Sequence, residues 1–178
     1  MAAEIRLSGE TVFEGKIVNV RVDTVGLRNG GRAIREVVEH RPAVVLVPID
    51  PDGNMVLVRQ YRYPAGETLL EAPAGIIEES ETPLACAQRE LQEETGYRAR
   101  HLKALGSFWT TPGFSDELMY GYVATGLEPS RLEPDDDEDI TVERIPPSQV
   151  TELIQRGEIR DAKTIAALLM VICRPSPD

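Results

Sequence analysis

Three glutamates stand close together near the middle of the chain: Glu90, Glu93 and Glu94. If this segment is a helix, spacings of three and four residues place all three carboxylates on one face. Like charges on one face destabilise an isolated helix, but a divalent cation among them reverses that effect. Carboxylate oxygens suit Mg²⁺ or Mn²⁺, which take further ligands from water and phosphates. A solvated acidic face is the commoner explanation of such a cluster, so the surrounding spacing has to decide.

The surrounding spacing follows a fixed pattern. Five residues separate Gly75 from Glu81, and seven more lead to the run Arg-Glu-Leu-Gln-Glu-Glu-Thr-Gly at residues 89–96. This stretch resembles the Nudix box, and every fixed position matches; the last, usually aliphatic, position is Tyr97. Many specified positions at fixed offsets make a specific signal. The resemblance implies an α/β fold, a Nudix-type α/β/α sandwich with a mixed sheet and an additional N-terminal antiparallel β-hairpin or sheet.

The resemblance also implies a role for each box residue. The backbone carbonyl of Ala74 and the carboxylates of Glu90 and Glu94 would be ligands of Mg²⁺, with Mn²⁺ as the alternative ion. Glu93 would be a further or supporting ligand and a candidate catalytic residue. Glu81 is expected to orient the loop and helix rather than bind metal.

The resemblance also implies a general base outside the box, on an acidic loop before a late strand. In this chain that loop is residues 135–139, and Glu138 is the candidate because of its placement before the strand-like run at 140–142. A solvated acidic loop with no single important residue is the plain alternative. The other candidate bases are Asp136, Asp137 and Asp139.

Features outside the box resemble ADP-ribose pyrophosphatases within the Nudix family. These are residues 56–62 and 71–75, which match the strand pair before the box, and Pro112, which lies about fifteen residues beyond it. The implied reaction is Mg²⁺-dependent hydrolysis of ADP-ribose to AMP and ribose 5-phosphate. Alternatives are another substrate, such as GDP-mannose, ADP-glucose or a dinucleoside polyphosphate, and a non-catalytic ADP-ribose sensor. Because sensors typically lose a box carboxylate, the sequence disfavours that alternative.

Five residues are candidates for substrate binding. Arg62 is predicted to contact phosphate, although an ion pair with Glu71, itself a candidate, would explain it as well. Arg35 could stack on the adenine, a role guanidinium groups can play, or be a solvated strand residue. Phe114 and Ser115 could line the terminal ribose or simply pack their loop.

Several elements must position these residues. Thr82, Pro83 and Gly96 have the types that cap, begin and end the box helix. A strand pair joined at Asn29-Gly30 predicts an N-terminal hairpin. Residues 1–41 are therefore expected to form a β-rich extension that resembles a dimer-forming sheet, and residues 42–178 the Nudix hydrolase domain. Two later helices are predicted, one with Ser148 as its cap and a last one over 161–174. The last helix is expected to face inward through Ile165, Leu168, Leu169 and Ile172.

Charge and composition argue against several classes of partner. The net charge of −11 over 178 residues argues against a nucleic-acid binder. The longest apolar run, residues 165–173, is too short to span a membrane. The N-terminus lacks signal-peptide features. Cys86 and Cys173 are expected to be buried thiols in a reducing compartment. These features predict a cytoplasmic protein, and the resemblance implies a homodimeric enzyme that acts on a small nucleoside diphosphate sugar.

Overall fold

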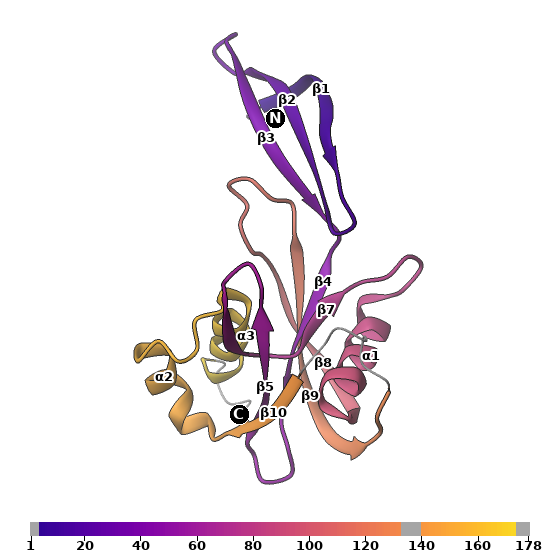
Figure 1. Cartoon of the computed structure of the whole chain (residues 1–178), viewed down its shortest axis with the longest axis vertical. Coiled ribbons are helices and arrows are strands. Elements are labelled where there is room, and N and C mark those ends of the chain that lie inside the picture. The colour runs from indigo at the N-terminus through magenta and orange to yellow at the C-terminus, as the bar shows by residue number, and fades with distance from the viewer. Residues whose placement is uncertain (1–3, 133–139, 174–178) are drawn as a thin grey trace. The chain divides into compact units, whose positions relative to one another are not determined.

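The computed structural model describes residues 4–132 and 140–173, which form two compact units (Figure 1). The first unit holds the N-terminal strands and residues 109–118, and the second holds the remaining elements. The elements are β1 (Glu4–Glu14), β2 (Val18–Leu27), β3 (Arg32–His40), β4 (Ala43–Pro48), β5 (Met55–Arg62), β6 (Glu67–Glu71), β7 (Ala74–Ile76), α1 (Pro83–Thr95), β8 (Tyr97–Trp109), β9 (Leu118–Pro129), β10 (Ile140–Ile145), α2 (Pro147–Gln155) and α3 (Ala162–Ile172).

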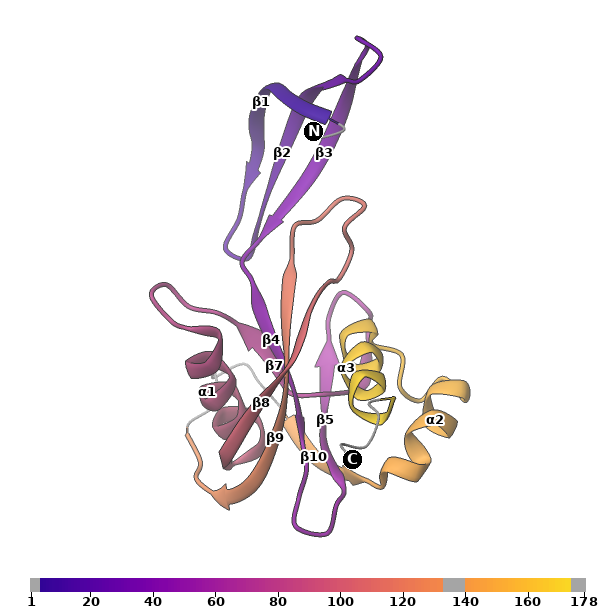
Figure 2. The same ribbon diagram turned by 180° about the vertical axis from the view of Figure 1, so that it is seen from behind.

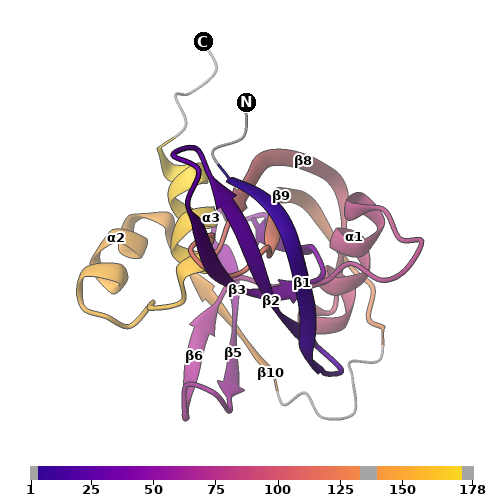
Figure 3. The ribbon, with the colours of Figure 1, turned by 90° about the horizontal axis from the view of Figure 1, so that it is seen from above.

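The first unit is an antiparallel sheet in which β2 lies between β1 and β3 (Figure 3). The predicted hairpin turn joins β2 to β3, and Gly30 there takes a left-handed φ of 82°, which glycine adopts without steric cost. Residues 109–118 join this unit along β3. The Val38 amide donates to the Phe114 carbonyl at 2.7 Å, and the Asp116 amide donates to the Val38 carbonyl at 3.2 Å.

The second unit is built around β4, which is buried along its whole length. Its sheet has the order β7-β4-β9-β8, with β4 parallel to β9 and antiparallel to β7; a second sheet has the order β10-β5-β6. Side chains alternate along a strand, so Val45 and Val47 pack into the core with α2 and α3, whereas Val44 and Leu46 pack into the core with α1. Both views show α1 on one side of the strands and α2 with α3 on the other (Figure 2). This arrangement confirms the predicted α/β/α sandwich with a mixed sheet.

The box helix begins and ends where the sequence predicts. The Thr82 hydroxyl accepts a hydrogen bond from the Ala85 amide at 3.2 Å, and Pro83 is the first residue of α1. Gly96 ends the helix with φ of 75°, the left-handed conformation. The register of α1 is therefore set by local sequence, and this register fixes which way its glutamates point.

Other details of the helices differ from the prediction. Pro146, not Ser148, precedes the first turn of α2, and no side chain caps that helix. In α3 the prediction of four inward residues is half right: Leu168 is buried and Ile165 packs against the core. Leu169 and Ile172 are 37% and 38% exposed, because α3 is covered along a narrower stripe than its apolar sequence suggests.

The two cysteines also differ from each other. Cys86 lies in α1 and is buried as predicted, but Cys173 is exposed because α3 ends at the residue before it. Within the described ranges, no helix has both the length and the apolar character needed to cross a membrane.

Candidate active site

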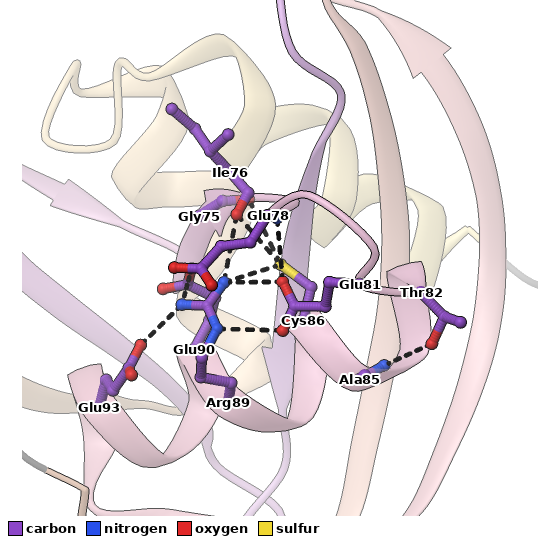
Figure 4. A network of polar contacts seen from close by, with 10 residues as sticks. All are labelled: Gly75, Ile76, Glu78, Glu81, Thr82, Ala85, Cys86, Arg89, Glu90 and Glu93. Carbon is purple, nitrogen blue, oxygen red and sulfur yellow. Dashed lines mark hydrogen bonds and ion pairs between the residues drawn. The ribbon is translucent and has the colours of Figure 1, made fainter. Parts of the chain in front are cut away.

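The Arg89 guanidinium organises the acidic face of α1 (Figure 4). Its Nε and Nη2 atoms donate to the two carboxylate oxygens of Glu81, both at 3.0 Å. Its Nη1 atom donates to Glu90 at 2.6 Å and to Glu93 at 2.8 Å. Nη2 also donates to the Ile76 carbonyl at 3.1 Å. One cation thus ties the loop before the helix to three carboxylates, which leaves an excess of negative charge.

The same contacts fix the charge of these groups. The hydrogen bond from Arg89 is the main cause that holds the pKa of Glu81 below its usual value. The Glu81 hydrogen bond likewise raises the pKa of Arg89. The Glu78 amide donates to Glu81 at 3.1 Å, so Glu81 closes the loop onto the helix as expected. Glu81 is therefore an anchor of the loop, and Glu90 and Glu93 complete the charged face.

Gly75 allows Glu90 to approach the strand edge. A Cβ atom at position 75 would lie 1.9 Å from Oε1 and 2.4 Å from Oε2 of Glu90. Glu90 is only 9% exposed, so its carboxylate occupies the space that any other residue at 75 would need for its side chain. Position 75 therefore has to be glycine, because any side chain there would collide with the Glu90 carboxylate.

Glu94 lies against the same segment. The Ala74 amide stands 3.5 Å from Oε1 of Glu94, which is 6% exposed. Glu90 and Glu94 are one turn apart on α1, so the segment at 74–75 faces both carboxylates. Two buried carboxylates in this position are costly unless cations accompany them.

The donors at this face fit a hard divalent cation. Among residues 4–132 and 140–173, no three histidine, cysteine, aspartate or glutamate side chains are already gathered as a ligand cage. An oxygen-only pair, Glu90 and Glu94, next to the Ala74 backbone is instead the partial set that Mg²⁺ uses when water and phosphate complete its shell. The Glu93 side chain is 22% exposed and that of Glu90 is 11% exposed, so Glu93 suits a supporting place better than a central one.

A second charged group lies beside this face. The Arg62 guanidinium binds Glu71 with two parallel hydrogen bonds, from Nε at 3.0 Å and from Nη2 at 2.9 Å. Lys163 also forms an ion pair with Glu71 and lies 3.0 Å from Asp161. The Glu71 side chain is 1% exposed, whereas that of Arg62 is 37% exposed. The ion pair that the sequence offers as an alternative for Arg62 is therefore present.

The contacts of Glu71 and Arg62 favour the charged forms of both side chains. Burial alone would raise the pKa of Glu71, but the hydrogen bonds and charges of Arg62 and Lys163 outweigh burial and lower it. Burial opposes the charge of Arg62 too, yet Glu71 and the negative charge of Glu94 raise the pKa of Arg62. Glu71, which holds Arg62, lies three residues before Ala74, whose amide donates to Glu94 at 3.5 Å, so the chain brings Arg62 to the segment that faces the box carboxylates.

The remaining predicted residues fall elsewhere. Arg35 lies in the first unit, where its Nε donates to Glu4 at 3.0 Å. Phe114 and Ser115 lie in the same unit, in the segment bound to β3, and Phe114 is 57% exposed. Glu138 and its neighbours in the acidic loop lie outside the described residues. The other predicted residues all lie in the second unit: Ala74, Glu90, Glu93, Glu94, Arg62 and Glu71.

The sequence reasoning missed Lys163, Asp161 and Thr164. The one local signal is Asp161, which caps α3 by accepting from the Thr164 amide at 2.9 Å. The contact of Lys163 with Glu71 spans 92 residues, and no spacing rule links positions so far apart.

Comparison with known proteins agrees with this geometry. The profile of the NUDIX domain matches residues 39–168, and that of the nucleoside diphosphate sugar hydrolase N-terminal domain matches residues 4–38. The chain belongs to the Nudix family. This confirms the family predicted from the box spacing.

Two curated relatives and one solved structure extend the comparison. The chain is 36% identical to an ADP-ribose pyrophosphatase of Bacillus subtilis (strain 168), over 93% of this chain and 90% of that protein. It is 42% identical to an ADP-ribose pyrophosphatase of Mycobacterium tuberculosis, over 93% of this chain and 81% of the relative. A crystal structure of an ADP compounds hydrolase is similar with a TM-score of 0.87 and 29% identity, over 96% and 93% of the two chains.

Proposed function

We propose that this Nudix protein hydrolyses the pyrophosphate bond of ADP-ribose and releases AMP and ribose 5-phosphate. One observation carries the proposal: Glu71, which binds Arg62 with two hydrogen bonds, lies three residues before Ala74, whose amide donates to Glu94 at 3.5 Å. A carboxylate face that suits a divalent cation and a guanidinium that suits phosphate thus adjoin. A diphosphate needs both, and the ADP-ribose pyrophosphatases among the relatives supply the class of substrate.

The candidate site residues in the second unit each have a part in this mechanism. Glu90, Glu94 and the Ala74 carbonyl would hold Mg²⁺ or Mn²⁺, with Glu93 as a supporting ligand and candidate catalytic group. The bound ion would polarise the phosphoryl oxygens and lower the pKa of the attacking water. Arg89 orients Glu90 and Glu93 through its two Nη1 contacts.

The diphosphate and the water need further groups. Arg62 binds a phosphate oxygen through the part of its guanidinium that Glu71 leaves open. Glu71 is buried and contacts Arg62 and Lys163, so its part in substrate binding is to hold Arg62. Glu138 remains our candidate for the base that takes the proton of the attacking water.

The ends of the substrate are assigned by resemblance. We propose that Arg35 contacts the adenine and that Phe114 and Ser115 line the terminal ribose. The exposed ring of Phe114 is available for such a contact. Arg35 would have to exchange part of its pairing with Glu4 for the base.

The quaternary structure is part of the same proposal. We propose a cytoplasmic homodimer in which residues 1–41 form the dimer sheet and residues 42–178 the Nudix hydrolase domain, with no nucleic-acid or membrane partner. Exposed apolar side chains are numerous in the first unit, and exposed apolar patches commonly mark interfaces. Those more than half exposed in its N-terminal strands and turns are Ile5, Leu7, Val12, Phe13, Ile17 and Ile34.

Turnover of ADP-ribose in ¹⁸O-water with Mg²⁺ tests the proposed function. We expect AMP and ribose 5-phosphate, one of them labelled, with ADP-glucose and GDP-mannose turned over more slowly. Faster turnover of either competitor would reassign the substrate. Binding of ADP-ribose without turnover, with Mg²⁺ or Mn²⁺, would instead indicate a sensor.

Variants test the assigned roles. Glu90→Gln and Glu94→Gln should each abolish turnover and weaken Mn²⁺ binding while the circular dichroism spectrum stays the same. Glu138→Gln should reduce turnover with Mn²⁺ binding unchanged, and an unaltered rate would move the base to a neighbouring aspartate. Glu152→Gln is the control, because the Glu152 side chain is 66% exposed on α2 and should leave turnover unchanged.

A further inference from the structure

Lys163 stands in the first turn of α3 and shares one carboxylate with Arg62. Its ammonium group forms ion pairs with Glu71 and, at 3.0 Å, with Asp161. The Lys163 side chain is 16% exposed and that of Glu71 is 1% exposed. Glu71 therefore accepts from two cations that come from different elements, β5 and α3.

The arrangement changes how much charge Arg62 can offer a ligand. A buried carboxylate with one bidentate arginine forms a neutral pair, and such an arginine has little charge left for an anion. A second cation on the same carboxylate offsets part of its negative charge, so the guanidinium keeps more of its own. Asp161 offsets part of the charge of Lys163. This offset is limited, because the Oδ2 atom of Asp161 also accepts from the amide and the hydroxyl of Thr164.

The geometry leaves one side of Arg62 available. Glu71 takes its Nε and Nη2 atoms, and no residue in the described part of the chain accepts from Nη1. With 37% of its side chain exposed, Arg62 can use the remaining N–H groups for phosphate oxygens. Charge-assisted bonds of this kind depend on the plane of the guanidinium, and that plane is set by the Glu71 carboxylate.

Lys163 is itself held in place by a buried polar contact. The hydroxyl of Thr164, which is fully buried, accepts from the Ala72 amide at 2.8 Å. Ala72 lies between Glu71 and Ala74, so the start of α3 is fixed to the segment that leads into the box. Lys163 is thereby held beside Glu71.

We propose that Lys163 is a positioning residue of the pyrophosphate site. Through Glu71 it orients Arg62 and leaves more of the Arg62 charge available to the substrate, without touching the substrate itself. The inference rests on the proposed function, since it assumes that Arg62 binds the diphosphate. It adds to that function a residue from α3, which lies across the strands from α1.

Affinity for a methylene-bridged, non-hydrolysable ADP-ribose analogue in the presence of Mg²⁺ tests the inference. We expect Lys163→Met to raise its Kd by about 10- to 100-fold, the range for losing hydrogen bonds to charged groups. Lys163→Arg should recover most of the affinity. The matched control is Arg160→Met, because Arg160 lies three residues earlier and pairs with Glu67 at the exposed start of β6. An unchanged Kd for Lys163→Met would overturn the inference.

A double-mutant cycle separates positioning from direct contact. If Lys163 acts through Arg62, then Lys163→Met should cost at most about twofold in an Arg62→Met background, since coupled sites are not additive. Full additivity would show that the effect of Lys163 does not pass through Arg62 and would overturn the positioning role.

Two further measurements keep the test decisive if Lys163→Met is unstable or the enzyme activity is absent. The paired change Glu71→Gln with Lys163→Met keeps the net charge, so it should fold; we expect weak analogue binding, and wild-type affinity would overturn the inference. The ¹⁵N signal of Arg62 Nε needs no ligand. It should exchange its proton faster with water in Lys163→Met, and an unchanged rate would overturn the inference alone. A wild-type protein that neither binds nor hydrolyses ADP-ribose would overturn the proposed function alone.

Discussion

The Glu90 carboxylate occupies the space in which a side chain at Gly75 would lie, with only 1.9 Å between a Cβ at that position and Glu90 Oε1. The backbone of Gly75 does not have a left-handed φ. Alanine would therefore meet no backbone strain there, and its entire effect would come from displacing Glu90. An alanine at this position therefore tests the site more than the fold, because the displaced group is one of the proposed metal ligands.

Gly75→Ala should reduce turnover of ADP-ribose by at least about 100-fold, since displacement of a reacting group by about 1 Å costs that much. Mn²⁺ affinity should fall with it, while the free energy of unfolding decreases by only about 1–3 kcal/mol. Gly26→Ala is the control, because a Cβ there would meet Leu7 at an ordinary 3.5 Å. Wild-type turnover and Mn²⁺ affinity in Gly75→Ala would contradict the proposed position of the metal ligand.

Arg89→Met should lower the free energy of unfolding by about 2–4 kcal/mol, because three partly buried carboxylates lose their shared cation. Arg89→Lys keeps the charge but loses the planar fork, so about 1–2 kcal/mol is expected. Urea denaturation at pH 7 measures both. Arg156→Met removes a pair whose side chains are 63% and 66% exposed, and should change stability by less than about 1 kcal/mol.

The cost of Arg89→Met should depend on pH. Arg89 lowers the folded-state pKa of Glu81, and a lowered carboxylate pKa contributes stability above the unfolded value of about 4.3. That contribution disappears as pH falls through the folded pKa. The difference between wild type and Arg89→Met should thus be constant from pH 7 to about 5 and shrink below about 4.3. A difference that stays constant down to pH 3.5 would contradict the role given to Glu81.

The box and its helix could be predicted because their determinants are local. Thr82, Pro83 and Gly96 act within one turn of the ends of α1, and the offsets of the glutamates fix their face. The buried strand β4 and the acidic helix α1 could likewise be recognised, because each follows from a pattern within its own short segment. Such signals do not depend on where distant segments pack.

The remainder of the site depends on packing between distant segments. Lys163 reaches Glu71 only because α3 lies against the end of β6, and no periodicity encodes that contact. The wrong expectation for Leu169 has the same cause, since the width of the covered stripe on α3 is set by its neighbours. Ser148 failed as a cap because Pro146 already sets the first turn of α2.

Thr164→Val should lower the free energy of unfolding by about 1–3 kcal/mol, the cost of leaving a buried backbone amide without its acceptor. The lost bond joins the Thr164 hydroxyl to the Ala72 amide, and valine keeps the shape of the side chain. Thr164→Ser keeps the hydroxyl and should cost less than Thr164→Val. Guanidinium denaturation of the three proteins measures this order. Equal stability of Thr164→Val and wild type would show that the Ala72 amide does not depend on this bond.

The two thiols should differ in reactivity. Burial, followed by the negative charges of Glu90 and Glu81, raises the pKa of Cys86, and the thiolate is the reactive form. Cys173 is exposed. Titration with a disulfide reagent at pH 8 should therefore modify one thiol in the native protein and two in guanidinium. In Cys173→Ser the rapid reaction should vanish, and rapid modification of both native thiols would contradict the buried position of Cys86.

Disruption of the apolar surface of the first unit should separate the proposed dimer. Phe13 and Ile34 are 55% and 58% exposed, and a glutamate at either position would place a charge inside an interface formed by this sheet, where it is costly to desolvate. Light scattering should give the wild type twice the 19.7 kDa of one chain and give Phe13→Glu and Ile34→Glu the mass of one chain. Leu84→Glu is the control, since Leu84 is 52% exposed but lies on α1 in the second unit. A wild type with the mass of one chain, or glutamate variants that remain dimeric, would contradict a dimer built on this sheet.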